Sequence, residues 1–311
     1  MRMNFDALII GTATVALAGC GGAGGGGVQS MPNPITVAPP PPSSPSPPPS
    51  PPPLPTGPIG LQSNAPFATQ AAHLDASGFN IGSDAVEFSY SSSDNAYTIT
   101  VPHHSPGRLV TIGGNGSYNA TGWTHLQGTH NQVQSQPVSA PVTVNLDWPG
   151  SSTLTYTSVG EWAEGGAFPI NRGFFAYGIP TTAGDVPVSG AGTYTAAVRG
   201  MTEDGTFVGG SVALAFDFGA GTLSGAMKPV LYPWDAYPLG TYTFRDTVYS
   251  SGSTTFSGAF IVPGSNAPSS FSGNFTGPQA AEFMASWRAP YVYSNGGPAG
   301  TMAGVWTGKK D

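Results

Sequence analysis

The sequence predicts an all-β fold in which a closed antiparallel β-barrel follows a smaller β subdomain. Glycine, serine, threonine and aromatic residues dominate the 311 residues, and only 8% of them are charged. Ordinary globular proteins have about 25% charged residues. No segment keeps an apolar period of 3.6 residues, and several alternate apolar and polar residues at a period of two, which is typical of strands.

Two segments, residues 211–218 and 241–248, show this alternation most clearly. Their apolar faces are Val212, Leu214, Phe216 and Phe218 in the first and Tyr242, Phe244 and Val248 in the second. Further strands are predicted at Phe174–Gly178, Gly192–Arg199, Thr222–Met227, Thr255–Val262, Ser270–Phe275, Glu282–Arg288 and Ala303–Thr307. The glycines of residues 217–221 favour a hairpin turn. Because closure removes exposed strand edges, we expect these short strands to form one barrel over residues 170–311.

The smaller β subdomain is expected at residues 60–168. Its strand-like runs are Ala85–Tyr90, Tyr97–Val101, Val142–Trp148 and Thr153–Val159. Longer polar loops separate these runs, and all five histidines of the chain lie in this part.

Residues 1–19 are typical of a secretory signal peptide. The apolar run from Ala7 to Ala18 would cover about 18 Å as a helix, which is short of the ~30 Å of a bilayer core. Leu17-Ala18-Gly19-Cys20 resembles the bacterial lipobox, so we expect Cys20 to carry a lipid anchor. The alternative is an ordinary signal peptide with an incidental cysteine. Gly21 stands where an aspartate favours inner-membrane retention, so the expected location is the outer membrane, at the cell surface.

Residues 20–58 are predicted to form an unfolded tether. Glycines follow Cys20, and 15 prolines lie between Pro32 and Pro58. Such a composition favours polyproline II spacers, which extend by ~3.1 Å per residue. A PxxP docking site is the alternative interpretation.

The sequence has no Gly-x-Ser-x-Gly, no His-Glu-x-x-His, no phosphate-binding glycine-rich loop before a helix and no EF-hand pattern, so we expect no enzymatic activity and no resident cofactor. A net charge of −7 without a basic segment argues against nucleic acid as a partner. His103 and His104 follow Pro102 in a predicted loop, where both could bind zinc or a haem iron together with His125 or His130. The alternative is that these histidines are solvated loop residues.

Five segments of the C-terminal half share motifs with one family. They are FFAYGIPT at 174–181, PVSGAGTYT at 187–195, AFDFGAGTLSG at 215–225, FSGNFTGPQAAE at 271–282 and AGVWTGKK at 303–310. In this order they resemble the β-barrel domain of the transferrin-binding protein B-like surface lipoproteins. The resemblance implies an eight-stranded barrel beside a handle-like β subdomain.

The resemblance also implies a function. Members of this family are lipid-anchored surface proteins that capture host iron carriers beside a TonB-dependent transporter, and relatives bind haemoglobin or complement factor H. We therefore expect a binding protein for a protein or a metal or haem carrier. A lipocalin-like barrel that holds a small ligand and a passive structural lipoprotein of the envelope remain alternatives.

The shared motifs are read as fold determinants. Phe271, Phe275, Phe283 and Trp287 are candidates for filling the barrel, and Gly277-Pro278 is a rigid turn. Glu282 is expected to bond turn amides or a base rather than to act as a general base. Ligand contacts are expected in the loops 201–205, 229–238, 262–268 and 289–298. The second loop contains Trp234 and two tyrosines, and aromatic residues in loops are typical of binding hot spots. The alternative is that these aromatic residues cover one end of the barrel.

Overall fold

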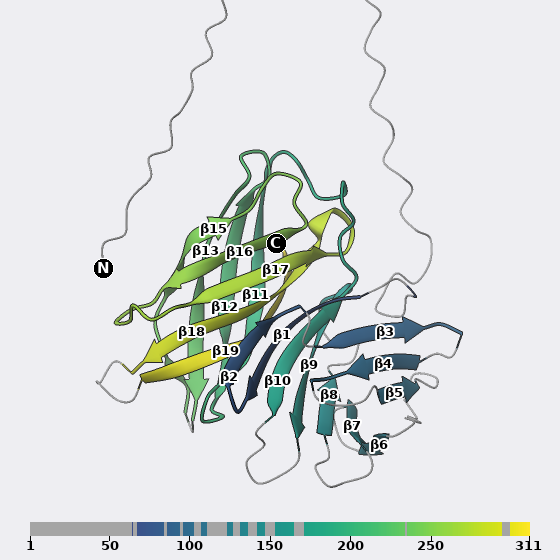
Figure 1. Cartoon of the computed structure of the whole chain (residues 1–311). Helices are drawn as coiled ribbons and strands as arrows, with labels where there is room; N and C mark the ends of the chain where they lie inside the picture. Colours follow the sequence, from purple (N-terminus) through teal and green to yellow (C-terminus); the bar gives the residue numbers. More distant parts are fainter. Residues whose placement is uncertain are drawn as a thin grey trace, which may run out of the picture. The chain divides into compact units, whose positions relative to one another are not determined.

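A computed structural model gives the structure of the chain. It describes residue 64 and the ranges 67–83, 86–93, 96–102, 107–110, 123–126, 131–135, 142–146, 153–164, 171–233, 235–293 and 299–311. The predicted signal peptide, Cys20 and the predicted tether lie outside the described residues. Figure 1 shows the described part as a barrel, drawn in green to yellow, beside a second set of strands drawn in blue to teal.

The barrel is a closed antiparallel sheet, as the sequence predicts. Its sheet has nine strands in the order β12-β11-β19-β18-β17-β16-β15-β13-β14, and β12 also pairs with β13. Since β14 has only two residues, the other eight strands form the barrel. Their bounds are Ala191–Thr202 (β11), Phe207–Asp217 (β12), Thr222–Tyr232 (β13), Tyr242–Val248 (β15), Thr255–Ile261 (β16), Ser270–Thr276 (β17), Glu282–Val292 (β18) and Ala299–Lys310 (β19), with β14 at Tyr237–Pro238. The β12–β13 pairing leaves no open edge in this ring of strands.

The handle, as we call the remaining strands, contains two sheets. The larger has seven strands in the order β2-β1-β10-β9-β8-β7-β6, and the smaller has the order β3-β4-β5. The bounds are Ala68–Asp75 (β1), Gly78–Gly82 (β2), Glu87–Ser91 (β3), Ala96–Thr100 (β4), Gly107–Val110 (β5), Trp123–Leu126 (β6), Asn131–Ser135 (β7), Val142–Leu146 (β8), Thr157–Glu164 (β9) and Arg172–Gly178 (β10). In the described residues the only helical element is the 3₁₀ turn Pro278–Ala280, and none is long and apolar enough to cross a membrane.

Aromatic rings fill the barrel interior. Phe275 is fully buried, and its ring centroid lies 4.9 Å from that of Phe216 and 5.5 Å from that of Phe256. The centroids of Tyr194, Phe218 and Tyr249 lie within 6.2 Å of the same ring. Phe271, Phe275, Phe283 and Trp287 are all buried, which confirms their predicted role.

A second group of rings surrounds Trp306. Its centroid lies 5.2 Å from that of Phe271, 5.7 Å from that of Phe244 and 5.8 Å from that of Phe260. An eight-stranded barrel is just wide enough to be filled by side chains or to hold one small ligand. Here the rings take the space along the axis, so the interior is a core.

The alternation predicted in two strands is largely present. Val212, Leu214, Phe216 and Phe218 are buried in the barrel, as are Tyr242 and Phe244. Val248 is 64% exposed instead. Asp246 has a φ of 49°, and the register of β15 against β16 shifts between Arg245 and Val248. The prediction for Val248 is wrong because this bulge turns the end of the strand over.

β10 was predicted as a barrel strand, but it pairs with β1 and β9 in the handle. Apolar and polar residues do not alternate in the middle of β10, because both faces of this strand are covered. Phe174 and Ala176 belong to one apolar cluster with the barrel residues Met284, Ala303 and Val305. Phe175 and Tyr177 belong to another, with Phe88 and Tyr97 of the smaller handle sheet. A strand buried on both sides reads as a continuous apolar run, which the sequence alone cannot assign to one of two neighbouring sheets.

The filled interior predicts a large loss of stability for Phe275→Ala. Removing a buried phenylalanine ring that contacts several others costs about 3–5 kcal/mol. Urea unfolding followed by tryptophan fluorescence measures this loss. The control is Val188→Ala, since Val188 is 66% exposed and a surface change of this kind alters stability by less than about 0.5 kcal/mol. Equal midpoints for the two variants would contradict a packed interior.

Candidate functional site

The predicted zinc or haem ligands His103 and His104 lie outside the described residues, as does His130. His73 is described on β1, where its Nε2 lies 3.2 Å from Asp75 Oδ2. Hydrogen bonds from Ser77 lower the pKa of the Asp75 carboxyl, so this partner is a carboxylate. Within the described ranges no group of three or more histidine, cysteine, aspartate or glutamate side chains could hold a metal ion.

The loops predicted as contact surfaces meet at one end of the barrel. Every neighbouring pair of barrel strands is antiparallel, so β11, β13, β16 and β18 run in the same direction. The connections that follow them, residues 203–206, 233–241, 262–269 and 293–298, therefore lie at the same end. We call this the loop end, and Trp234 and residues 294–298 of it lie outside the described residues.

Two groups of aromatic residues mark the loop end. Tyr293 is partly buried, and its ring centroid lies 5.0 Å from that of Tyr237 and 5.7 Å from that of Tyr291. Phe207 and Tyr232 pair across β12 and β13, with ring centroids 5.8 Å apart and each residue 44% exposed. Large rings that remain exposed beside a rigid sheet are typical of binding surfaces.

Carboxylates lie beside the tyrosines. Asp204 accepts hydrogen bonds from the hydroxyl of Thr202 and the amide of Thr206, which hold its pKa below the usual range. Burial raises the pKa of the Tyr291 hydroxyl, and the negative charges of Asp204 and Glu203 raise it further. The loop end thus combines aromatic rings with negative charge.

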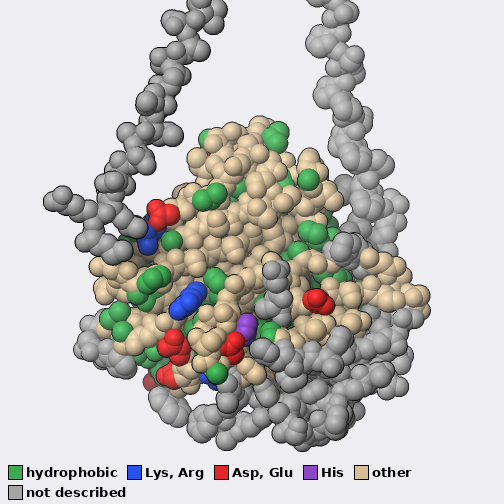
Figure 2. Space-filling model, viewed as in Figure 1, with side chains coloured by type: hydrophobic (Ala, Val, Ile, Leu, Met, Phe, Trp, Pro, Cys, Tyr) green, Lys and Arg blue, Asp and Glu red, His purple; other side chains and the backbone are tan. Residues whose placement is uncertain are grey.

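The loop end continues onto the handle. Arg172 of β10 donates from Nη2 to the carbonyl oxygen of Glu203 at 3.3 Å. The ring of Phe174 lies 6.2 Å from that of Phe207. Both handle and barrel therefore contribute to one continuous surface. The visible face in Figure 2 is mostly uncharged, and hydrophobic atoms are scattered over it rather than gathered in one patch.

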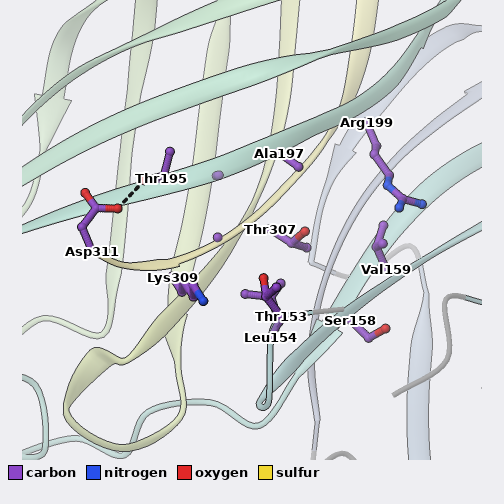
Figure 3. A pocket seen from close by; sticks show the side chains of 12 residues that line it. Thr153, Leu154, Ser158, Val159, Thr195, Ala197, Arg199, Thr307, Lys309 and Asp311 are labelled. Carbon is purple, nitrogen blue, oxygen red and sulfur yellow. Dashed lines mark hydrogen bonds between the residues drawn. The ribbon is translucent and has the colours of Figure 1, made fainter. Parts of the chain in front are cut away.

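A second candidate is a cleft between the outer wall of the barrel and the segment that leads into β9. Its volume is about 310 Å³, at the lower end of the range of ligand pockets. Thr153, Leu154, Ser158 and Val159 line one side, and outward-facing residues of β11 and β19 line the other. Figure 3 shows Arg199 and Lys309 on opposite sides of Thr307 in this cleft. The sequence did not predict it, because its walls come from three segments that are separate in the sequence, at 153–159, 195–199 and 307–311.

Glu282 holds the handle side of the cleft in place. Its buried carboxylate accepts hydrogen bonds from the amides of Thr155 at 2.6 Å and Tyr156 at 2.9 Å. Burial raises the pKa of Glu282, and these amide bonds oppose the rise. The prediction that Glu282 bonds turn amides is confirmed. Beside it, the hydroxyl groups of Thr157 and Thr276 form a hydrogen bond, with an Oγ1–Oγ1 distance of 2.5 Å.

We call the contact between the barrel and the segment that leads into β9 the junction. The turn after β17 completes it. Gly277 has a φ of 70°, which suits glycine, and its amide donates to the carbonyl oxygen of Ile179 at 2.8 Å. A Cβ at Gly277 would lie 2.3 Å from the ring of Tyr156. The rigid turn predicted at Gly277-Pro278 is therefore also the place where the chain before β9 contacts the barrel.

No family model and no curated protein matches the chain. Solved structures do. A double mutant of transferrin-binding protein B from Haemophilus parasuis is 17% identical with a TM-score of 0.47, over 78% of this chain and 44% of that chain. The isotype 1 protein from serogroup B Neisseria meningitidis is 18% identical with a TM-score of 0.44, over 78% and 43%. A surface lipoprotein is 14% identical with a TM-score of 0.37, over 80% and 100%.

At 14–18% identity and TM-scores of 0.37–0.47, these are remote likenesses. This chain spans less than half the length of the two transferrin-binding proteins. Another match is an intact protein of this kind with N and C lobes, whereas the described residues here form one barrel and one handle.

The junction predicts that Glu282→Gln destabilises the protein. Glutamine keeps the size of the side chain but replaces one acceptor oxygen by a donor, so one amide of the pair loses its partner. The expected cost is about 1–3 kcal/mol, measured by urea unfolding with Glu87→Gln, which changes an exposed residue of β3, as the matched control. An unchanged midpoint for Glu282→Gln would contradict this role.

The same comparison should depend on pH. Because the pKa of Glu282 is raised in the folded state, the folded protein binds a proton that the unfolded chain releases. The contribution of Glu282 protonation to the stability of the wild-type protein is therefore complete below the ordinary pKa of glutamate. It is lost as the pH rises through the raised pKa. We expect the stability difference from Glu282→Gln to be largest in acid and to shrink over that window.

Proposed function

We propose that the chain is a lipid-anchored binding protein of the cell surface. In this proposal the loop end captures a protein or a metal or haem carrier, beside a TonB-dependent outer-membrane transporter. The observation that carries it is the convergence of four loops, with exposed rings and carboxylates, at one end of a rigid barrel. Lipid at Cys20 and the segment 20–58 would hold this surface away from the membrane.

The geometry of the loop end suits a macromolecular ligand. Protein interfaces depend on a few aromatic anchors surrounded by polar groups. Tyr237 and Tyr293 supply such anchors, because both are only partly buried where they pack against the barrel core. Phe207 and Tyr232 extend the surface toward the handle.

The alternative of a lipocalin-like barrel finds no support in the interior. The rings around Phe275 and Trp306 occupy the space that such a ligand would need. A passive envelope lipoprotein is distinguished by gene deletion, which would then change cell shape or permeability and leave nutrient uptake unchanged. The zinc or haem ligands His103 and His104 remain a prediction, tested by titrating the purified protein and its double alanine variant with zinc and with haem.

The proposal predicts that Tyr237→Ala combined with Tyr293→Ala abolishes capture of the ligand. Tagged wild-type protein on intact cells is cross-linked and purified, and bound proteins and the transporter are identified by mass spectrometry. The control Val248→Ala changes an exposed residue at the other end of the barrel. A partner retained by wild type and control and lost by the double variant is the expected result. Identical recovery from all three proteins, or no partner from wild type, would sink the proposal.

The anchor is tested separately. Cys20→Ala should abolish labelling by radioactive palmitate and release the protein from membranes into the soluble fraction. Retention of label and of membrane association at wild-type level would contradict the anchor and leave the loop end untouched.

A further inference from the structure

The connection between β11 and β12, residues 203–206, is bonded to the handle as well as to the barrel. The link is the main chain of Glu203. Its amide donates to the carbonyl oxygen of Thr301 in β19 at 3.2 Å, and its carbonyl oxygen accepts from Arg172 Nη2 in β10 at 3.3 Å. One residue of the loop end is therefore held from two sides.

The guanidinium of Arg172 also packs directly on the backbone of this connection. Gly205 has a φ of 90°, and a Cβ at this position would lie 2.4 Å from Arg172 Nη1. A larger residue would therefore displace the guanidinium, and the positive φ independently favours glycine. Gly205 thus leaves the space that Arg172 occupies.

Phe174 fixes the strand that carries Arg172. The two residues lie two apart on β10, so their side chains share one face of the sheet. Phe174 is buried in an apolar cluster that includes Met201 of β11. Its ring also lies 6.2 Å from that of Phe207, the first residue of β12. The handle therefore contacts both strands that the connection joins, and Arg172 extends from a well-packed strand.

Hydrogen bonds within residues 202–206 fix the shape of the connection. The amide of Gly205 donates to the carbonyl oxygen of Thr202, and the amide of Thr206 donates to the hydroxyl of Thr202, both at 2.9 Å. Such bonds would persist if the connection tilted as a unit. The bonds of Glu203 to Thr301 and to Arg172 reach outside it, so they resist a tilt.

Electrostatics favour the same arrangement. Burial lowers the pKa of the Arg172 guanidinium, and the negative charge of Asp204 opposes this effect. An arginine stays charged at neutral pH. The positive charge beside the connection therefore attracts the Asp204 carboxylate.

We propose that Arg172 is a positioning residue of the loop end. It holds residues 203–206 in one orientation against the handle, and it thereby sets where the carboxylates of Glu203 and Asp204 meet the ligand. The inference rests on the proposed function for the ligand only, because the position of the connection is measured without one.

Hydrogen–deuterium exchange of the purified protein, followed by mass spectrometry, tests this position. In Arg172→Ala, the peptide that contains residues 203–206 should exchange about fivefold faster, which is the effect expected for the loss of one hydrogen bond. Arg172→Lys keeps a charged donor and should restore part of the protection. Exchange in residues 271–276 of β17 should stay unchanged, whereas a general loss of stability would raise it too.

Gly205→Ala tests the same contact from the side of the connection. It should also speed exchange in residues 203–206, because the new Cβ displaces the guanidinium. In the Arg172→Ala background its effect should be smaller, since only the strain of the positive φ remains. The matched control is Lys228→Ala, which removes an exposed cation of β13 and should leave exchange in residues 203–206 at the wild-type rate.

Capture on intact cells tests the consequence for the ligand. Arg172→Ala should lower recovery of the partner that wild type binds by about fivefold or more, and Arg172→Lys should lower it less. Unchanged exchange in Arg172→Ala, an equal rise in Lys228→Ala, or full recovery of the partner despite faster exchange would each overturn the inference. The proposed function fails on a different result, the absence of any partner from wild type, and the exchange data still decide the position of the connection.

Discussion

Closure of the barrel through the pairing of β12 with β13 is the constraint on which the other features depend. A closed ring of strands offers no edge to a partner, and eight strands enclose little more than their own side chains. Because Phe275, Trp306 and the rings around them fill the interior of the barrel, a ligand can bind only at the ends of the barrel or on its outer wall. Both candidate sites lie there, on surfaces that are not buried in the core.

The outer wall of the barrel has an apolar part and a polar part. Where the handle covers it, β18 and β19 present Met284, Ala303 and Val305, and the two parts share an apolar cluster. Farther along β19 the outward-facing residues are Thr307 and Lys309. Here the handle no longer packs directly on the barrel wall, and the cleft lies between them. The junction between these regions is polar and buried, with Glu282 and Thr276 facing the chain before β9. Separating handle from barrel would therefore expose apolar surface and also leave a carboxylate without its amide partners.

Much of the barrel could be predicted from the sequence, since its strands alternate between core and solvent at a period of two. Val212, Leu214 and Phe216 are examples, and Gly277-Pro278 and Glu282 kept their predicted roles. Three features could not be predicted, for different reasons. The bulge at Asp246 turns the side chain of Val248 to the outside of the barrel, and the apolar pattern of the sequence gives no sign of it. β10 is apolar on both faces and so carries no period. The cleft requires the register of β11 against β19, which only the folded chain supplies. The candidate contact loops were predicted individually, but their convergence follows from the strand directions.

The position of β1 has a mechanical consequence. It is the first described strand after the proline-rich segment, so tension on an anchored chain would enter the fold there. β1 is paired on both sides, with β10 over seven residues and with β2 over five. A pull along the strand axis would load all these hydrogen bonds at once, whereas a pull across the axis would break them one after another. Under the proposed anchoring at Cys20, β1 would resist a load along its axis in shear, and the handle would transmit that load to the barrel.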